Sequence, residues 1–309
     1  MAGVNDTVEE AEKLSALVKN LNCHVNLIPV NPIKERDFVQ TGKKAVERFK
    51  RVLEKNRINV TIRREMGRDI NGACGLEMTL CGKKGRNQVN NYKINAFGKT
   101  DVGLMRTINQ DSIFVSTKPV GKLPNLFIVA DGMGGHKAGD VASRVAIEKF
   151  VKYACTTHMT DPANILDAGI MSINKEIYDM ANSNRDYSGM GTTFVAAVIA
   201  EGHVYIANVG DSRLYYIGKD IQQITRDHSL VEDMVRMGLL EKEEARTHYK
   251  KNVITKAIGV AEDKTATPDI FEIEIDNGDK LLLCSDGLTN MVIDYDINKI
   301  IRKSESIED

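Results

Sequence analysis

FVAAVIAEGHVYIANVGDSRLYYI, residues 194–217, decides the fold of most of this 309-residue chain. Two runs of mostly apolar residues, 194–200 and 203–209, are separated by a Glu-Gly pair, and strands joined by so short a turn indicate an antiparallel hairpin. A third strand, 213–217, follows at once and ends at another glycine-containing turn. Strands that follow one another so closely predict an antiparallel sheet.

Helices and further strands cluster around this meander. A second hairpin is predicted across an Asp-Asn-Gly turn, which is a strong turn signal. The sequence therefore predicts an α+β fold, an antiparallel β-sandwich flanked by helices, for residues 94–309. The other predicted elements are a strand at 126–130, helices at 138–151 and 165–180, and the hairpin strands at 271–275 and 280–284.

The N-terminal part has a different pattern. Helices are predicted over 7–18 and 43–55, and strands over 24–28 and 60–62, so helix and strand alternate. Such alternation is typical of α/β architecture with parallel strands, but two strands are too few to close a sheet. We therefore predict an incomplete α/β segment at residues 1–80. A linker is predicted at 81–93, where the sequence is polar, basic and without periodicity.

Composition excludes several classes of protein. With 42 Lys+Arg, 43 Asp+Glu and 42% hydrophobic residues, the chain is neither disordered nor collagen-like. Five cysteines without a CxxC pair indicate neither a disulfide framework nor a structural zinc site. No apolar run is long enough to span a membrane and no signal peptide is recognisable, which predicts a cytoplasmic protein without membrane insertion.

Charge divides the chain unevenly. Residues 1–93 carry a net charge of +7 and residues 94–309 a net charge of −8. Two modules with different partners are therefore predicted, and nucleic acid suits the basic one.

Aspartates recur where predicted strands end. Asp131 and Asp286 each follow an apolar strand and precede a glycine, while Asp211 and Asp111 have similar surroundings. Carboxylates on rigid strand ends suit hard divalent cations such as Mg²⁺ or Mn²⁺, whereas zinc is disfavoured because no His or Cys cluster accompanies them. A single Asp-Gly pair is more simply a turn. Four such positions together favour a metal site.

Seven segments carry a resemblance to a known family. In this order they closely resemble the motifs of the PPM-type (type 2C) metal-dependent protein serine/threonine phosphatases, and the bacterial branch is the nearest match. The resemblance covers about residues 94–305. The segments are TDVGLMRTINQDS (100–112), FIVADGMGGHKAGDVAS (127–143), SGMGTTFVAAVI (188–199), ANVGDSRLYYI (207–217), QITRDHSLVEDM (223–234), VITKAIG (253–259) and LLLCSDGLTNMV (281–292).

The resemblance implies a metal centre. Asp131 matches the aspartate that bridges two Mn²⁺ or Mg²⁺ ions, the Gly132 carbonyl a further ligand, and Asp286 the second metal aspartate. Asp111 would hold metal-bound water, and Asp211 with Asp286 would support a third, weaker ion. The implied reaction is hydrolysis of phosphoserine and phosphothreonine by a two-metal activated water, in line and without a phosphoenzyme.

The resemblance also implies substrate contacts and partners. Arg106 matches the arginine that binds the substrate phosphate, and the partners would be phosphorylated proteins that a bacterial serine/threonine kinase modifies. Met133 stands where some members have a general-acid histidine, so the acid stays unassigned between His136 and metal-bound water. Residues 226–259 match the variable flap, whose acidic helices are either a solvated face or a substrate-selecting one.

The chain departs from the family in one respect. The family's domain continues to a Gly-Gly-x-Asp-Asn-[Ile/Val]-Thr motif on its last strand, whose first aspartate is another metal ligand, whereas this sequence ends at Asp309. We therefore expect a missing ligand, an unpaired core strand edge and reduced activity. A non-catalytic phosphoprotein-binding module is the corresponding alternative.

Residues 1–80 resemble a different family, on the segments 2–33 and 58–75. They look like the C-terminal end of radical S-adenosylmethionine ribosomal RNA adenine methyltransferases, and a fragment of such an enzyme is the second functional hypothesis. Asn31 matches a contact to S-adenosylmethionine and Cys74 the methyl-carrying cysteine, both as vestigial positions. The CxxxCxxC motif is absent, so no Fe–S cluster is expected. The simplest explanation is a read-through of two genes or a sequence fragment spanning them.

Overall fold

The computed structural model divides the chain into two units, residues 1–70 and 71–309. The residues that it describes are 7–18, 24–27, 43–56, 58–62, 75–81, 93–103, 107–134, 138–262, 266–304 and 306–307. In these ranges no helix is long and apolar enough to cross a membrane.

The first unit has the predicted alternation of helix and strand. Its elements are α1 (Val8–Val18), β1 (His24–Leu27), α2 (Lys43–Lys55) and β2 (Asn59–Ile62). The two strands pair in parallel, as the α/β pattern predicts. Ala11, Phe49, Leu53 and Ile58 are buried together in a small core. The resemblance of residues 1–80 implies part of a radical S-adenosylmethionine barrel, and the two paired strands among the described residues of this unit give that expectation no support.

The second unit is built from two antiparallel sheets. The five-stranded sheet has the order β11-β10-β13-β3-β4, and the larger sheet has the order β12-β9-β8-β6-β5, with β7 paired to β6. The strands are β3 (Gly75–Cys81), β4 (Lys93–Lys99), β5 (Asp111–Ser116), β6 (Leu126–Met133), β7 (Gly191–Thr192), β8 (Phe194–Ala200), β9 (His203–Val209), β10 (Arg213–Ile217), β11 (Ile221–Gln223), β12 (Asp269–Glu274) and β13 (Lys280–Cys284). The helices are α3 (Ala138–Thr156), α4 (Pro162–Ser183), α5 (Leu230–Arg236), α6 (Lys242–Ala245), α7 (Asp286–Thr289) and α8 (Asp294–Lys303).

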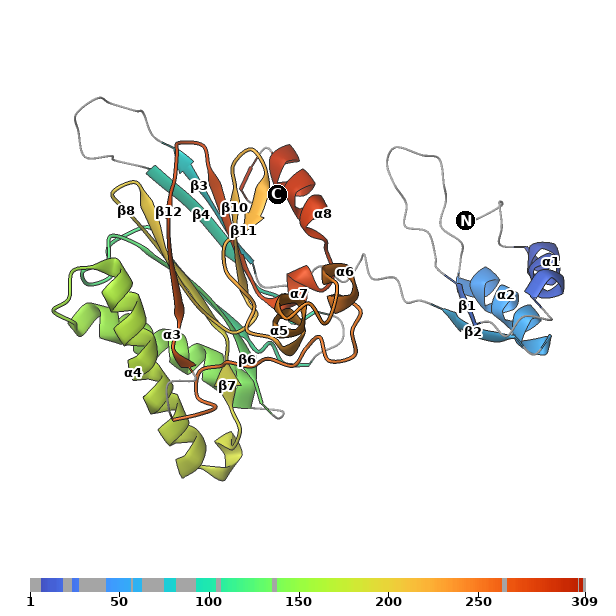
Figure 1. Cartoon of the computed structure of the whole chain (residues 1–309), viewed down its shortest axis with the longest axis horizontal. Coiled ribbons are helices and arrows are strands. Elements are labelled where there is room, and N and C mark those ends of the chain that lie inside the picture. Colours follow the sequence, from blue (N-terminus) through green and yellow to red (C-terminus); the bar gives the residue numbers. More distant parts are fainter. Residues whose placement is uncertain are drawn as a thin grey trace. The chain divides into compact units, whose positions relative to one another are not determined.

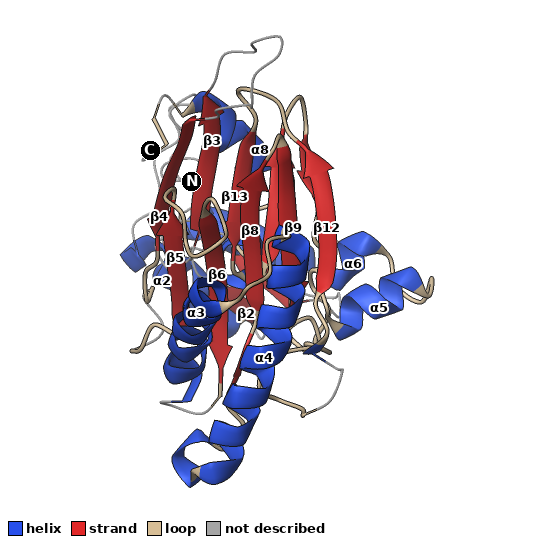
Figure 2. Ribbon diagram, turned by 90° about the vertical axis from the view of Figure 1, so that its left-hand side faces the viewer, coloured by secondary structure: helices blue, strands red, loops and turns tan. Residues whose placement is uncertain are grey.

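The sheets and helices form layers. Helices α3 and α4 lie side by side against the outer face of the larger sheet (Figures 1 and 2). Helix α8 covers the outer face of the five-stranded sheet, packing on β10 and β13 (Figure 1). Between the two sheets, a cluster of buried side chains from both of them forms a further part of the core. The predicted antiparallel α+β sandwich is therefore confirmed.

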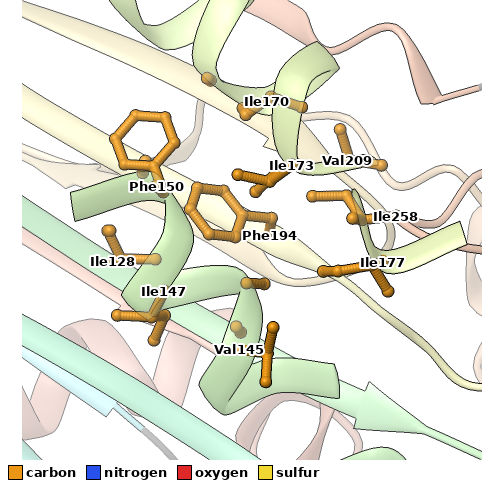
Figure 3. Close-up of a cluster of buried hydrophobic side chains, with 14 of the residues drawn as sticks. Ile128, Val145, Ile147, Phe150, Ile170, Ile173, Ile177, Phe194, Val209 and Ile258 are labelled. Atoms are coloured by element: carbon orange, nitrogen blue, oxygen red, sulfur yellow. The ribbon is translucent and has the colours of Figure 1, made fainter. Parts of the chain in front are cut away.

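The position of strand β8 in the interior of the unit explains why its sequence is continuously apolar. Phe194, with Ala196 and Val198, faces the helices, whereas Val195 and its alternate neighbours face the other sheet. A strand that is buried on both faces has no position for a polar residue. Phe194 lies 5.3 Å from Phe150 of α3, measured between ring centroids, at the centre of the cluster that Figure 3 shows.

The predicted hairpin of residues 271–275 and 280–284 is wrong. Strand β12 pairs with β9 in one sheet, whereas β13 pairs with β10 and β3 in the other. Burial explains the difference. Exposure alternates along β12, as expected of an edge strand, whereas Leu281 to Cys284 are buried on both faces and need an interior position.

The division between the units differs from the predicted one. All of strand β3 except its last residue lies within residues 1–80, which we assigned to a separate segment, yet the strand pairs with β13 on one side and β4 on the other. The boundary therefore falls between Ile70 and Asn71 rather than at 81–93. We expected a core strand with one unpaired edge. Strand β13 is not such a strand, because β10 pairs with one of its edges and β3 with the other.

Candidate metal centre

Two of the predicted aspartates face each other across neighbouring strands. Asp111 begins β5 and lies opposite Asp131 of β6 in the antiparallel register. Directly opposed residues of this kind have Cβ atoms about 5 Å apart, and like charges there destabilise a sheet. The fold therefore holds these two carboxyl groups together against their own repulsion.

The other two aspartates come from the same ends of further strands. Asp211 follows β9 in the tight turn to β10, and Asp286 begins α7 directly after β13. Burial raises the pKa of Asp131 well above its usual range, and the charges of Asp111 and Asp286 and, to a smaller extent, Asp211 raise it further. The structure thus brings all four predicted carboxylates within electrostatic reach of one another.

Asp211 is perturbed in the same direction. Burial raises its pKa to about 7, with further contributions from Asp286 and Asp227. Arg213 opposes the shift, but this guanidinium is already paired with Asp227, with 2.7 Å between Nη2 and Oδ2. Carboxylates that raise one another's pKa in this way favour bound cations or protons.

The carboxylate oxygens of these aspartates suit hard cations, although they are not arranged as a complete coordination site. Among the described residues, no group of three or more His, Cys, Asp or Glu side chains is arranged to hold a metal ion. Carboxylates that repel one another favour a wider spacing than a bound cation imposes. Oxygen donors and the excess negative charge match the preference of Mg²⁺ or Mn²⁺.

Gly132 provides backbone at the place where a side chain cannot fit. A Cβ atom there would collide with the carbonyl of Gly139 at the start of α3 and would lie 2.8 Å from the Gln110 oxygen. The Gly132 amide donates to that Gln110 oxygen at 2.9 Å. The close approach of α3 therefore requires glycine directly after Asp131.

Hydroxyl groups fix the backbone around Asp131. Thr193 Oγ1 accepts from the Asp131 amide at 2.9 Å, and Thr192 Oγ1 donates to the Asp131 carbonyl at 2.9 Å. Thr193 Oγ1 also lies 2.7 Å from Ser212 Oγ, beside Asp211. Sequence reasoning did not single out these hydroxyl residues, although they belong to the quoted motifs.

Asp111 and Asp286 are held by polar groups at the end of β13. Ser285 Oγ donates to Asp111 Oδ2 at 2.8 Å. Asn290 Nδ2 donates to Asp286 Oδ2 at 2.8 Å, and Asn290 Oδ1 accepts from Lys251 Nζ at 3.0 Å. The predicted flap is thereby connected to the site by Lys251. Ser285 and Asn290 were also missed.

A buried histidine supports the turn that carries Asp211. His228 Nδ1 accepts from the Gly210 amide at 3.0 Å, and its Nε2 lies 3.2 Å from Asp269 Oδ2. Burial lowers the pKa of His228, and the charge of Lys256 lowers it further. A neutral ring with its proton on Nε2 matches these two contacts.

A cavity of about 390 Å³ lies beside Asp211 and Asp286. It is bounded by residues 226–259, which contain α5 and α6, and Lys242, Arg246 and Lys251 line it.

The acidic residues of the segment 226–259 fall into two groups by their exposure to solvent. Glu241, Glu243 and Glu244 are exposed, as a solvated face requires, whereas Asp227, Glu232 and Asp233 are at least partly buried.

Several predicted positions lie outside the described residues. These are Arg106, His136, Asn31 and Cys74. Met133 is described as the last residue of β6, paired with Gly191. Its thioether side chain has no proton to donate.

We expect Asp211→Asn to stabilise the metal-free protein at high pH but not at low pH. The unfolded chain releases the Asp211 proton near pH 4, whereas the folded chain keeps it to about pH 7. The stability that this group contributes is therefore full below about pH 4 and is lost as the pH rises to about 7. Asparagine does not ionise, so in EDTA at pH 8 the variant should gain on the order of 2 kcal/mol. Thermal unfolding at pH 4 and pH 8 measures this, and an equal effect at both pH values would contradict it.

The sequence matches a known family over the second unit. The family described as protein phosphatase 2C matches residues 105–307. Serine/threonine phosphatase stp of Listeria innocua is 43% identical over 216 residues, which cover 68% of this chain and 84% of that protein. Protein phosphatase PhpP of Streptococcus pneumoniae is 36% identical over 213 residues, covering 68% and 85%.

Solved structures agree with this match. Serine/threonine phosphatase Stp1 of Staphylococcus aureus superposes with a TM-score of 0.60 at 41% identity, covering 66% of this chain and 82% of that one. The catalytic domain of the phosphatase PstP, in complex with two manganese ions, gives a TM-score of 0.57 at 29% identity, covering 75% and 88%. Sequence and fold together show that this chain belongs to the protein phosphatase 2C family and is a protein phosphatase.

Proposed function

We propose that Asp131, the Gly132 carbonyl and Asp286 hold two divalent cations, Mn²⁺ or Mg²⁺, and that Asp211 with Asp286 holds a third more weakly. The observation that carries this proposal is the gathering of partly buried carboxylates around Asp131, whose charges raise its pKa and that of Asp211. The two manganese ions in the related PstP structure support it. Bound cations would lower the pKa of water and neutralise the oxygens of a phosphoryl group.

The chain's own residues would orient the reaction. Asp111, whose Oδ2 accepts a hydrogen bond from Ser285, would accept a second one from the attacking water. Arg106 is proposed to bind the substrate phosphate through its planar guanidinium, which suits two phosphate oxygens. Met133 donates no proton, so the leaving oxygen takes its proton from another group. The hydrogen bond from Asn290 fixes the Asp286 carboxylate in advance of binding, and those made by Thr192 and Thr193 fix the backbone of Asp131.

The proposed substrates are proteins phosphorylated on serine or threonine. Their support is the serine/threonine specificity in the relatives' names, and a cavity beside Asp211 and Asp286 offers room next to the proposed metal ligands. A bacterial serine/threonine kinase that phosphorylates the same proteins is the proposed partner. A cytoplasmic location stays a prediction. So does the resemblance of residues 1–80 to the methyltransferases, whose key positions lie outside the described residues.

Matched phosphopeptides test the specificity. We expect the full chain with Mn²⁺ to release phosphate from phosphoserine and phosphothreonine peptides at least tenfold faster than from a phosphotyrosine peptide of the same sequence. EDTA should abolish release. Phosphopeptide binding without any release would favour the alternative, a non-catalytic phosphoprotein-binding module.

A further inference from the structure

Strand β3 lies outside the residues that the protein phosphatase 2C model matches, yet it is interior to a sheet. The family match begins at residue 105, and β3 ends at residue 81. Its residues pair antiparallel with β13 from Gly75 to Thr79 and with β4 from Gly75 to Cys81. Removing such a strand would leave the facing backbone groups of both neighbours without partners, which is costly in a buried position.

Side chains fix β3 on both of its faces. Leu76 and Met78 are fully buried between the sheets, with Leu281 and Leu283 in the same cluster. On the opposite face Glu77, whose side chain is 15% exposed, lies 3.1 Å from Lys280 Nζ. Lys280 also donates to the Ile301 carbonyl of α8 at 3.0 Å, so the ion pair joins β3 to the outer helix. A strand attached in this way is part of the core.

Strand β3 also lies next to the end of β13, which leads into the candidate metal centre. Gly75 is opposite Cys284, the last residue of β13, and the next two residues are Ser285 and Asp286. Ser285 reaches across to Asp111 of the other sheet. The end of β13 therefore takes its position from β3 on one side and from β10 on the other.

We propose that residues 75–81 are a working part of the phosphatase unit, in which β3 positions the end of β13 and hence Ser285 and Asp286. The functional unit of this chain then begins near residue 75, well before the region that the family match covers. Strand β3 acts through its neighbours and is a positioning element, because none of its residues belongs to the candidate metal centre.

Substitution of a buried β3 residue in the full chain tests this role. Met78→Asp should lower the urea midpoint of unfolding and reduce Mn²⁺-dependent hydrolysis of p-nitrophenyl phosphate at least tenfold. The matched control is Met159→Asp, whose side chain is 43% exposed in a loop, and it should stay within twofold of the native chain. Native unfolding and native turnover of Met78→Asp would overturn the proposal.

Cross-linking tests the placement of β3 without destroying it. Thr79 is opposite Asn95 in β4, so Thr79→Cys with Asn95→Cys should form a disulfide on mild oxidation, located by mass mapping of proteolytic fragments. Thr79→Cys with Phe97→Cys, a position two residues along β4 that is opposite Glu77, should form little. The first cross-linked protein should retain hydrolysis within twofold. Equal cross-linking of both pairs, or inactivity of only the oxidised form, would overturn the proposal.

These readouts separate the role of β3 from the proposed function. If the native chain hydrolyses no phosphate, the proposed function fails, but the unfolding midpoint and the cross-link still decide whether β3 belongs to the unit.

Discussion

Asp131→Asn should reduce Mn²⁺-dependent hydrolysis of p-nitrophenyl phosphate at least a thousandfold. Asp131 is the carboxyl group on which the charges of Asp111, Asp286 and Asp211 all act, so its replacement removes the centre of the cluster. Bound metal ions would stabilise the negative charge of the transition state by several kcal/mol. Losing that stabilisation lowers the rate by about three orders of magnitude. Steady-state hydrolysis over a range of Mn²⁺ concentrations measures the effect.

The matched control for this variant is Asp179→Asn on α4. Asp179 is exposed and, in the part of the chain that the structure describes, forms an ion pair only with Lys175 of the same helix, so its loss should leave turnover unchanged. The variant should fold, because the backbone amide of residue 131 still donates to Thr193 and its carbonyl still accepts from Thr192. Urea unfolding of the variant checks this. Turnover of folded Asp131→Asn at a tenth of the native rate or more would contradict the assignment.

Gly132→Ala should destabilise the fold by about 3 kcal/mol and remove activity with it. The added methyl group would meet the backbone of Gly139 and Gln110, and backbone yields less easily than the end of a flexible side chain. Urea unfolding in EDTA measures the loss separately from metal binding.

Gly75→Ala is the control for the glycine substitution. The nearest atoms to a Cβ at Gly75 are 3.9 Å away, which is ordinary contact, so this variant should unfold within about 0.5 kcal/mol of the native chain. An unchanged midpoint for Gly132→Ala would show that α3 can move away from the Asp-Gly turn.

Periodicity predicted most of the elements, but not which sheet each strand joins. The run 194–200 is apolar throughout because both of its faces are buried, and it was correctly read as a strand. The Asp-Asn-Gly turn after β12 is a real local signal, yet it connects strands of different sheets. A turn motif describes four residues, whereas sheet membership depends on burial across the whole unit.

The residues of the candidate site likewise include some that the sequence predicts and others that it does not. Aspartates at strand ends could be found because carboxylates carry recognisable chemistry wherever they stand. Thr193, Ser285 and Asn290 could not, because hydroxyl and amide groups are ordinary in sequence and gain a role only through contacts. Ser285 reaches Asp111 across 174 positions of chain, and only the packing of the two sheets brings them together. Strand β3 was misassigned because its neighbours in sequence resemble another family.

Calorimetric titration of Mn²⁺ into the metal-free full chain tests the central claim most directly. The account predicts binding of at least two ions per chain, with loss of the tighter sites in both Asp131→Asn and Asp286→Asn, while Asp179→Asn binds as the native chain does. No Mn²⁺ binding, or binding that neither substitution changes, would contradict the assignment of the metal centre to these residues.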